Sequence, residues 1–309
     1  MKVIYKNLPA SKKECIAAIG VFDGVHLGHQ YILNKLIQES EEEGRQSLLI
    51  TFDIPPKMIL NKTFPGCITS SEDKKSIIKS MGVDYLWFLK THSSFLKQSG
   101  KEFIGYILEN FKIKKFIVGS DFRFGYKGET DVKRFRQYGD EYGFKVDALK
   151  KISWHNQIVS STLIRKLIKT GEFKEAEKFL GRKYVLTGSV HRGMRYGQKL
   201  GFPTANIDPF DYVVPSNGVY VAVVGVDKKN YLSAVNIGVR PTIRNSQKRV
   251  IEAHMLDFNK DILGKTITVV FLEKIREEKK FSRAEKLKEA IAWDVYCIKE
   301  KFRHVSWNV

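Results

Sequence analysis

The sequence has little cysteine and no long apolar run. Its 309 residues include only Cys15, Cys67 and Cys297, which are far apart and form no Cys-x-x-Cys pair. Such spacing indicates neither a disulfide framework nor a zinc site, so we expect reduced, structural cysteines. Nowhere do about 18 apolar residues follow one another, as a membrane span requires. Lysines also interrupt the region where a signal peptide would need an apolar run. We therefore expect a soluble, cytoplasmic protein with no membrane partner.

Acidic residues are in short supply, with 34 against 53 lysines and arginines and a net charge of +19. A basic chain of this kind binds nucleic acid, a membrane surface or a small polyanionic substrate. The lysines are scattered among glutamates, as over residues 35–43, and no basic stripe with interleaved aromatics or groove-reading motif is present. We expect small-molecule phosphate substrates and no nucleic-acid partner. Nothing in the sequence indicates an oligomeric state.

The length suits two domains with separate cores, and 43% of the residues are apolar. Up to about residue 180, apolar runs alternate with segments of helical periodicity. This alternation predicts an α/β, Rossmann-like domain with a parallel sheet covered on both faces and a ligand site at the carboxyl ends of its strands. The predicted strands are residues 16–22, 47–52, 84–89, 115–119 and 144–149, and the predicted helices are 31–43, 72–81, 101–111 and 131–142.

Two further helices, residues 162–169 and 172–180, are closed by Gly181, and we place the domain boundary there, giving domains 1–181 and 182–309. The second domain has closely spaced strands without helices between them, which predicts a small antiparallel β-barrel. Ser282 and Glu285 form a capping-box pattern that begins a C-terminal helix packed on the barrel. The predicted strands are residues 184–191, 219–226, 231–237, 250–256 and 266–272.

The first motif is GVFDGVHLGH, residues 20–29, where a strand runs into a helix. His26 and His29 would share one face of the first helical turn, beside unpaired N–H groups that bind phosphate. Gly20 and Gly24 let the backbone approach a ligand closely. Two interpretations stay open. Either the histidines bind phosphate, or they donate hydrogen bonds to buried carbonyls. A metal site would need ligands that nothing nearby supplies.

Two more segments fall at predicted strand ends or helix starts. The segment SSTLIR, residues 160–165, offers hydroxyls that cap a helix and Arg165, which could bind phosphate. Taken alone, ordinary capping explains its hydroxyls. The segment GSDFRFG, residues 119–125, directly follows an apolar strand, and it is either part of the ligand edge or a turn anchored by its aromatic residues.

In the second half, GFPTAN, residues 201–206, follows a basic, glycine-containing loop at residues 192–199. In an extended segment Thr204 and Asn206 project to the same side, where their oxygens suit Mg²⁺ with its nucleotide. The alternative is a polar turn into an edge strand. Further on, Glu252 and His254 alternate with apolar residues, so Glu252 is either a catalytic base or a solvated carboxylate.

The three segments of the first half, in this order, resemble the adenylyltransferase half of the bacterial bifunctional riboflavin kinase/FAD synthetase family over most of residues 14–181. The resemblance implies that the FMN phosphate attacks the α-phosphorus of ATP, with catalytic roles for His26, His29 and Arg165 and with Asp121 near the nucleotide and Mg²⁺. The ATP-binding residues that it implies are Gly20, Phe22, Asp23, His26, Gly28, His29, Asp121, Arg123, Ser161, Thr162 and Arg165.

One segment departs from that family. Relatives read Phe-x-Pro-His-Pro on the flavin side of the site, whereas residues 52–56 here are FDIPP, so only Phe52 and Pro56 match. An alternative hypothesis is therefore that only the kinase half is active and the first half is weakened or redirected. Two others are a cytidylyl- or pantetheine-type nucleotidyltransferase, which shares the His-x-Gly-His element, and a flavin-sensing or nucleic-acid-binding regulator, suggested by the charge.

Residues 183–303 resemble the riboflavin kinase module. The resemblance is carried by GFPTAN, by NIGVRPT at residues 236–242, by EAH at 252–254, and by Arg276 with residues 280–281. It implies a bifunctional enzyme that phosphorylates riboflavin to FMN and adenylylates FMN to FAD, using ATP and Mg²⁺. Glu252 would be the general base, with Asn236, Glu252 and Arg276 on the flavin side. The implied Mg-ATP residues are Gly201, Phe202, Pro203, Thr204 and Asn206, with Thr204 and Asn206 as the metal ligands.

Overall fold

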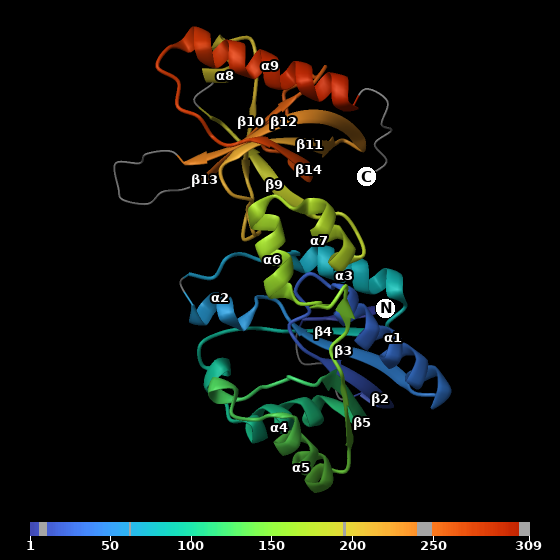
Figure 1. Ribbon diagram of the computed structural model, residues 1–309. Helices are drawn as coiled ribbons and strands as arrows, with labels where there is room; N and C mark the ends of the chain where they lie inside the picture. The colour runs from blue at the N-terminus through green and yellow to red at the C-terminus, as the bar shows by residue number, and fades with distance from the viewer. Residues whose placement is uncertain (6–10, 62, 194–195, 240–248, 303–309) are drawn as a thin grey trace. The chain divides into compact units, whose positions relative to one another are not determined.

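The computed structural model describes residues 1–5, 11–61, 63–193, 196–239 and 249–302. The chain forms two compact units, residues 1–163 and 164–309 (Figure 1). Helix α6 (Ser161–Thr170) begins in the first unit and continues into the second, which also contains α7 (Phe173–Leu180). Within the described ranges no helix combines the length and apolar composition that crossing a bilayer requires.

The first unit is built on a six-stranded sheet in the order β1-β4-β3-β2-β5-β6, in which every paired neighbour is parallel. The predicted parallel sheet is confirmed. The prediction missed β1, because a three-residue strand carries no readable periodicity. The strands are β1 (Lys2–Ile4), β2 (Ser11–Ile19), β3 (Gln46–Phe52), β4 (Tyr85–Leu89), β5 (Phe111–Gly119) and β6 (Lys145–Leu149).

Helices cover both faces of this sheet, as predicted (Figure 1). Along β2, Cys15, Ala17 and Ile19 pack into one core cluster, whereas Ile16 and Ala18 pack into the other. Helices α1 (Leu27–Glu42) and α3 (Ser71–Met81) supply one cluster, and α4 (Gly100–Asn110) and α5 (Val132–Tyr142) supply the other. The sheet is therefore buried on both sides. Minor elements are α2 (Pro56–Leu60), β7 (Ser153–Trp154) and β8 (Gln157–Ile158).

The strand order places a topological switch point between β2 and β5. From β2 the chain proceeds to β3 and β4 on one side of the sheet, and then returns to form β5 and β6 on the other. In open α/β sheets ligands bind outside the carboxyl ends of the strands at such a point. The segments that follow β2 and β5 are the histidine segment at residues 20–29 and the segment at 119–125. The topology therefore brings two of the three predicted motifs to one edge.

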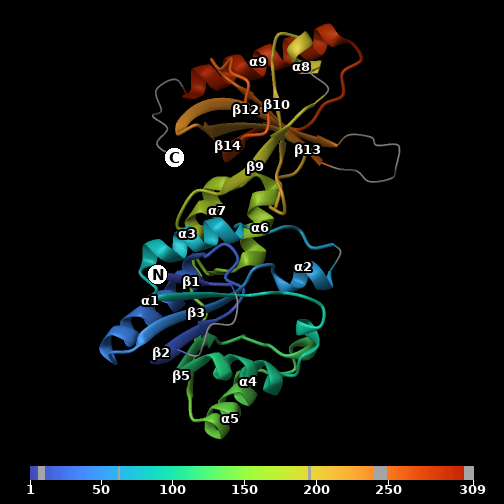
Figure 2. The same cartoon turned by 180° about the vertical axis from the view of Figure 1, so that it is seen from behind.

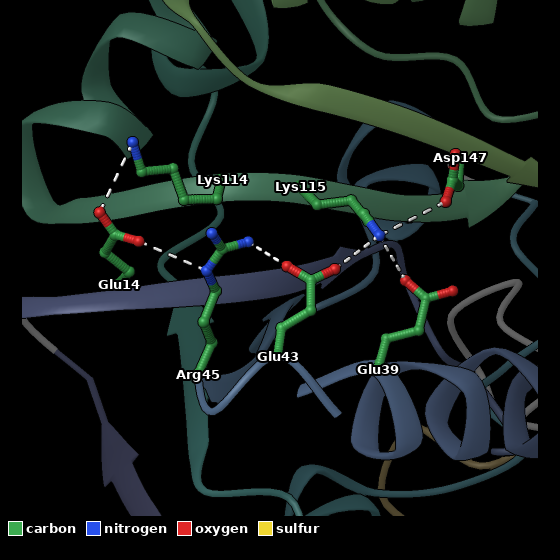
Figure 3. A network of polar contacts seen from close by, with 7 residues as sticks. All are labelled: Glu14, Glu39, Glu43, Arg45, Lys114, Lys115 and Asp147. Atoms are coloured by element: carbon green, nitrogen blue, oxygen red, sulfur yellow. Dashed lines mark hydrogen bonds and ion pairs between the residues drawn. The ribbon is translucent and has the colours of Figure 1, made fainter. Parts of the chain in front are cut away.

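A network of ion pairs stabilises the sheet away from that edge (Figure 3). Lys115 of β5 lies 2.9 Å from the carboxylates of both Glu39 and Glu43 of the α1 region. Arg45 pairs with Glu43 and, at 3.3 Å, with Glu14 of β2. Because the pairs join α1 to β2 and β5, this network ties the helix to the sheet at the amino ends of the strands.

The second unit contains a closed barrel in the order β10-β13-β12-β11-β14-β9, with all neighbours antiparallel. The predicted barrel is confirmed. The GFPTAN segment, which the sequence predicts only to be extended around Thr204 and Asn206, leads into its strand β10. Phe173 of α7 stacks on Phe271 and meets Tyr220 edge-on. The strands are β9 (Val185–His191), β10 (Ala205–Asp208), β11 (Gly218–Val226), β12 (Lys229–Val239), β13 (Arg249–Met255) and β14 (Thr266–Arg276), and a short helix α8 spans Tyr196–Lys199.

The C-terminal helix α9 (Ala284–Phe302) crosses the barrel, as predicted (Figure 2). Its Ile298 and Val295 pack with Val221 and Ala234 of the barrel wall. The predicted start is wrong by two residues. Because α9 begins at Ala284, Arg283 and not Ser282 immediately precedes the first helical residue, so the predicted capping box of Ser282 with Glu285 is not at the helix start.

Candidate active sites

The first candidate site begins with a strained loop after β2, residues 20–25, called the β2 loop below. Phe22, Gly24 and Val25 have φ values of 49°, 87° and 37°. A non-glycine residue in this region costs about 1–3 kcal/mol, and it persists only where the surroundings hold it. Asp23 is buried, and its carboxylate accepts hydrogen bonds from the N–H groups of Ile68 at 2.9 Å and Thr69 at 3.2 Å. The Asp23 side chain thus shapes the loop.

The two histidines lie at the N-terminus of α1, where the β2 loop ends. His26 is the N-cap residue, and its Nδ1 accepts a hydrogen bond from the His29 N–H at 3.3 Å. The rings stack with centroids 3.6 Å apart, and the Phe22 ring lies 4.8 Å from His29. A Cβ at Gly28 would come within 3.2 Å of the His26 ring, so a glycine allows this arrangement. The predicted juxtaposition of the imidazoles is confirmed.

The start of α6 meets the β2 loop. The Ser161 hydroxyl donates to the Asp23 carbonyl at 2.9 Å, so two predicted motifs far apart in sequence lie together. Ser160 caps the helix by accepting from the Leu163 N–H at 3.3 Å, which confirms the capping interpretation for this hydroxyl. Thr162 is exposed, and Arg165 lies one turn further along α6, already within the second unit.

The segment after β5 forms an anchored turn. Phe122 and Phe124 stack on each other, and both contact the core residue Phe135. Asp121 is exposed and pairs with Lys151 at 2.7 Å. The Nε of Arg123 donates to the Gly128 carbonyl at 2.8 Å, so this guanidinium holds its own loop. The interpretation as an aromatic anchor is confirmed, and nucleotide contacts from Asp121 and Arg123 stay a prediction.

The segment after β3, residues 52–56, is the one that departs from the family pattern, and it is called the β3 segment below. Its conformation is set by Asp53, whose Oδ1 accepts from the N–H groups of Ile54 at 2.7 Å and Thr91 at 2.8 Å. Phe52 meets Phe95 edge-on, and Pro56 is the first residue of α2. Although the family's histidine is missing, the segment is tied to the strand ends by hydrogen bonds.

The second candidate site is a row of polar residues across three barrel strands. In the strand register Glu252 of β13 pairs with Asn206 of β10 on one side and with Asn236 of β12 on the other. Directly opposed residues on neighbouring strands project to the same face. The flanking Ile251 and Ala253 are fully buried on the opposite face. The alternation predicted for β13 is confirmed, and it brings three predicted site residues together.

This row lines a pocket of about 300 Å³ on the face of the barrel that α9 covers. Helix α9 contributes Leu287, Ile291 and Asp294 to the pocket, and the strands contribute the polar row together with Val219 and Ala234. The pocket contains six predicted site residues, including Phe202, Thr204 and Arg276. Its lining consists of Gly197, Leu200, Phe202, Thr204, Asn206, Val219, Ala234, Asn236, Glu252, His254, Arg276, Glu278, Lys279, Phe281, Leu287, Ile291 and Asp294.

Glycines of the basic loop pack directly on the predicted metal ligands. A Cβ at Gly193 would overlap the Asn206 amide, and one at Gly197 would lie 3.3 Å from the Thr204 hydroxyl. His254 bonds through Nδ1 to the Pro203 carbonyl at 2.8 Å, which fixes the chain between Gly201 and Thr204 against β13. Met194 and Arg195 of the basic loop, and residues 240–242 of the family string, lie outside the described residues.

Sequence reasoning missed the partner of Arg276. The buried carboxylate of Asp294 accepts from Arg276 Nη2 at 2.7 Å and from Nε at 3.0 Å. Asp294 follows Ile291 by three residues and precedes Ile298 by four, so it lies on the apolar face of α9. A carboxylate on an apolar helix face is the signal that could have found it.

The first unit has a histidine pair at the switch point of a parallel sheet, and His26 of that pair caps α1. The second unit is a barrel whose pocket presents a carboxylate between two amides. These features define a two-domain nucleotide-dependent transferase. The family model for FAD synthetase matches residues 8–163, and the model for riboflavin kinase matches residues 180–302. The chain therefore belongs to the family of bifunctional riboflavin kinase/FMN adenylyltransferases.

Two relatives carry the name bifunctional riboflavin kinase/FMN adenylyltransferase. The protein from Buchnera aphidicola subsp. Schizaphis graminum is 36% identical over 96% of this chain and 96% of its own. The protein from Pseudomonas fluorescens is 35% identical over 94% of this chain and 93% of its own. A crystal structure of a Streptococcus pneumoniae protein described as a macrolide-efflux protein superposes with a TM-score of 0.82 at 27% identity, covering 98% of this chain and 99% of that one.

Proposed function

We propose that the domain of residues 1–181 adenylylates FMN to FAD and that the domain of residues 182–309 phosphorylates riboflavin to FMN. The observation that carries the proposal is the row Asn206, Glu252 and Asn236 inside the barrel pocket, which gives a carboxylate two amide neighbours and space for a substrate. Family membership and the histidine pair at the sheet's switch point support the second activity.

In the kinase reaction Glu252 takes the proton of the ribityl 5′-hydroxyl. The freed oxygen then bonds to the γ-phosphorus of ATP, the bond from that phosphorus to the ADP oxygen breaks, and FMN and ADP result. A positioned base of this kind contributes about 10²–10⁴-fold in rate. Arg276, fixed by Asp294, and Asn236 line the flavin side of the same pocket.

The oxygens available in the barrel fit a Mg²⁺ ion. Thr204 and Asn206 offer a hydroxyl and an amide oxygen, and the described residues contain no cluster of three or more His, Cys, Asp or Glu side chains that would form a metal cage. Mg²⁺ is usually held by one or two protein ligands with water and substrate phosphates filling its remaining positions. When bound, the ion would neutralise charge on the phosphates of ATP.

In the adenylylation reaction a phosphate oxygen of FMN bonds to the α-phosphorus of ATP, and the bond to pyrophosphate breaks. The protein's part is positioning and charge neutralisation. His26 and His29 stand where the N-terminus of α1 presents N–H groups and a partial positive charge, which suits phosphate. Ser161 and Thr162 at the start of α6 supply hydroxyls, and Arg165 supplies a cation. Phe52 and Pro56 are assigned to the flavin.

A product time course tests the proposal. Purified protein is incubated with riboflavin, ATP and Mg²⁺, and the flavins are separated by chromatography. We expect FMN to appear first and then to give way to FAD. FMN that accumulates without FAD would overturn the adenylylation half of the proposal and leave only the kinase activity. Absence of both products, with CTP as well as with ATP, would overturn the proposal.

A further inference from the structure

Lys74 of α3 is a buried lysine at the carboxyl ends of the sheet strands. Only 2% of it is exposed. Its Nζ donates to the Val21 carbonyl at 2.9 Å and the Phe52 carbonyl at 3.3 Å, and lies 3.5 Å from the Thr51 hydroxyl. All three of these partners are uncharged oxygens. A single cation therefore joins the β2 loop to the β3 segment through backbone carbonyls.

The segment that carries Lys74 holds the strained β2 loop at three points. The N–H groups of Ile68 and Thr69 bind the Asp23 carboxylate, and the Thr69 hydroxyl accepts from the Gly24 N–H at 3.0 Å. Lys74 binds the carbonyl just before Phe22. These contacts fall on both sides of the left-handed residue Phe22, so residues 68–74 determine the path of the loop that leads into the histidine pair.

The same segment also holds the β3 segment. The Ser71 hydroxyl donates to the Asp53 carbonyl at 2.7 Å, next to the Phe52 carbonyl that Lys74 binds. One helix start thus contacts the segment assigned to ATP and the segment assigned to the flavin. Phosphoryl-type transfer requires the reacting groups to be positioned accurately, and a misplacement of about 1 Å can lower the rate by about 10²-fold.

We propose that Lys74 is a positioning residue of the adenylyltransferase site, whose ammonium sets the β2 loop and the β3 segment at the spacing that FMN and ATP require. This inference rests on the proposed adenylylation activity. Lys74 acts through the two backbone segments, and it is not assigned a contact with substrate. The neutral amine would donate more weakly to the two carbonyls, so the charged form is the active one.

The charge state of Lys74 is sensitive to pH. Burial lowers the pKa of the Lys74 ammonium to about 8, against the opposing influence of Asp23, Cys67 and Asp53. The Phe88 ring also faces it, with the centroid 6.0 Å from Nζ. The ammonium is therefore present at pH 7 and is lost as the pH rises through about 8. Phosphate groups, with a second pKa of about 6, do not titrate in that range.

The test compares Lys74→Met with Lys75→Met in the full chain. Lys75 is the next residue of α3 and pairs with the exposed Glu72 at 3.2 Å, so it is a matched control for loss of a lysine. We expect K74M to lower kcat/KM for FAD formation from FMN and ATP on the order of 10²-fold. K75M should change this kcat/KM less than about twofold. Riboflavin phosphorylation by the same samples should stay unchanged.

A pH profile separates positioning from a merely structural role. The wild-type ratio of FAD formation to FMN formation should fall as the pH rises from 7 to 9.5, and Lys74→Arg, which stays charged, should shift or abolish that fall. K74M activity equal to wild type, or a wild-type ratio independent of pH, would overturn the inference. The wild-type profile decides the matter even if K74M does not fold. A wild-type protein that makes FMN but no FAD would instead overturn the adenylylation activity itself.

Discussion

Asn206 of β10 is directly opposed to Glu252 of β13 in the antiparallel register, and Asn236 of β12 is opposed to Glu252 on its other side. Nearly fifty residues of sequence separate the first two, and the antiparallel register alone makes them neighbours. The pairing places the predicted metal ligand beside the predicted base, so the phosphate donor and the accepting hydroxyl would meet at this row. Single substitutions in this row should therefore affect the kinase reaction and not the adenylylation reaction.

Glu252→Gln should remove most FMN formation, by about 10²–10⁴-fold, because the amide cannot accept the hydroxyl proton. FMN adenylylation should survive. Rates of both reactions, measured separately with riboflavin and with FMN, check this. Glu273→Gln is the matched control, since Glu273 lies on β14 and pairs with Lys301, outside the pocket lining. Wild-type FMN output from E252Q would remove Glu252 from the mechanism.

Gly193→Ala should impair the kinase reaction by displacing the Asn206 amide, which the new Cβ would overlap. Because Asn206 is a proposed Mg²⁺ ligand, the variant should need more Mg²⁺ for half-maximal FMN formation, and we expect a shift of about tenfold, as a lost ligand contact of roughly 1.4 kcal/mol would give. A Mg²⁺ titration of FMN formation measures it. Gly105→Ala on α4, where nothing lies within 4 Å, is the control and should leave the titration unaltered.

Asp294→Asn should weaken the link between α9 and β14. The Arg276 guanidinium would lose its charged acceptor while remaining largely buried, and we expect a loss of about 1.5–3 kcal/mol in unfolding free energy. Urea denaturation followed by circular dichroism measures this loss. The KM for riboflavin should rise in parallel, because Arg276 lines the pocket. An unchanged KM at reduced stability would limit Asp294 to a structural role.

Glu39→Gln should make the first unit less sensitive to acid without changing either activity. Burial raises the pKa of Glu39, but the ammonium groups of Lys115 and Lys35 outweigh burial and hold it below the ordinary 4.5. A depressed carboxyl pKa adds stability above the unfolded value, and that stability is lost as the pH falls through the folded value. Melting temperatures of both proteins between pH 6 and pH 3 should therefore converge. Melting curves that stay parallel would contradict this account of the network in Figure 3.

The fold was predictable because its signals are local. Residues 15–19 of β2 are continuously apolar and serve both faces of the sheet, and Gly181 closes α7 in a left-handed conformation as its position predicts. The errors also have local causes. Strand β1 is too short to show periodicity, and the capping signal at Ser282 lies two residues before α9 begins.

The sequence by itself determined the order of elements, the two domains' fold classes and the identity of the motif residues, because periodicity and residue chemistry are properties of neighbours along the chain. Only the tertiary structure decided which motifs meet. It brought Ser161 to Asp23, set Glu252 between two asparagines, gave Arg276 the carboxylate of Asp294, and buried the Lys74 ammonium between two strand ends. Those relationships depend on strand order, register and desolvation, which arise when distant segments pack.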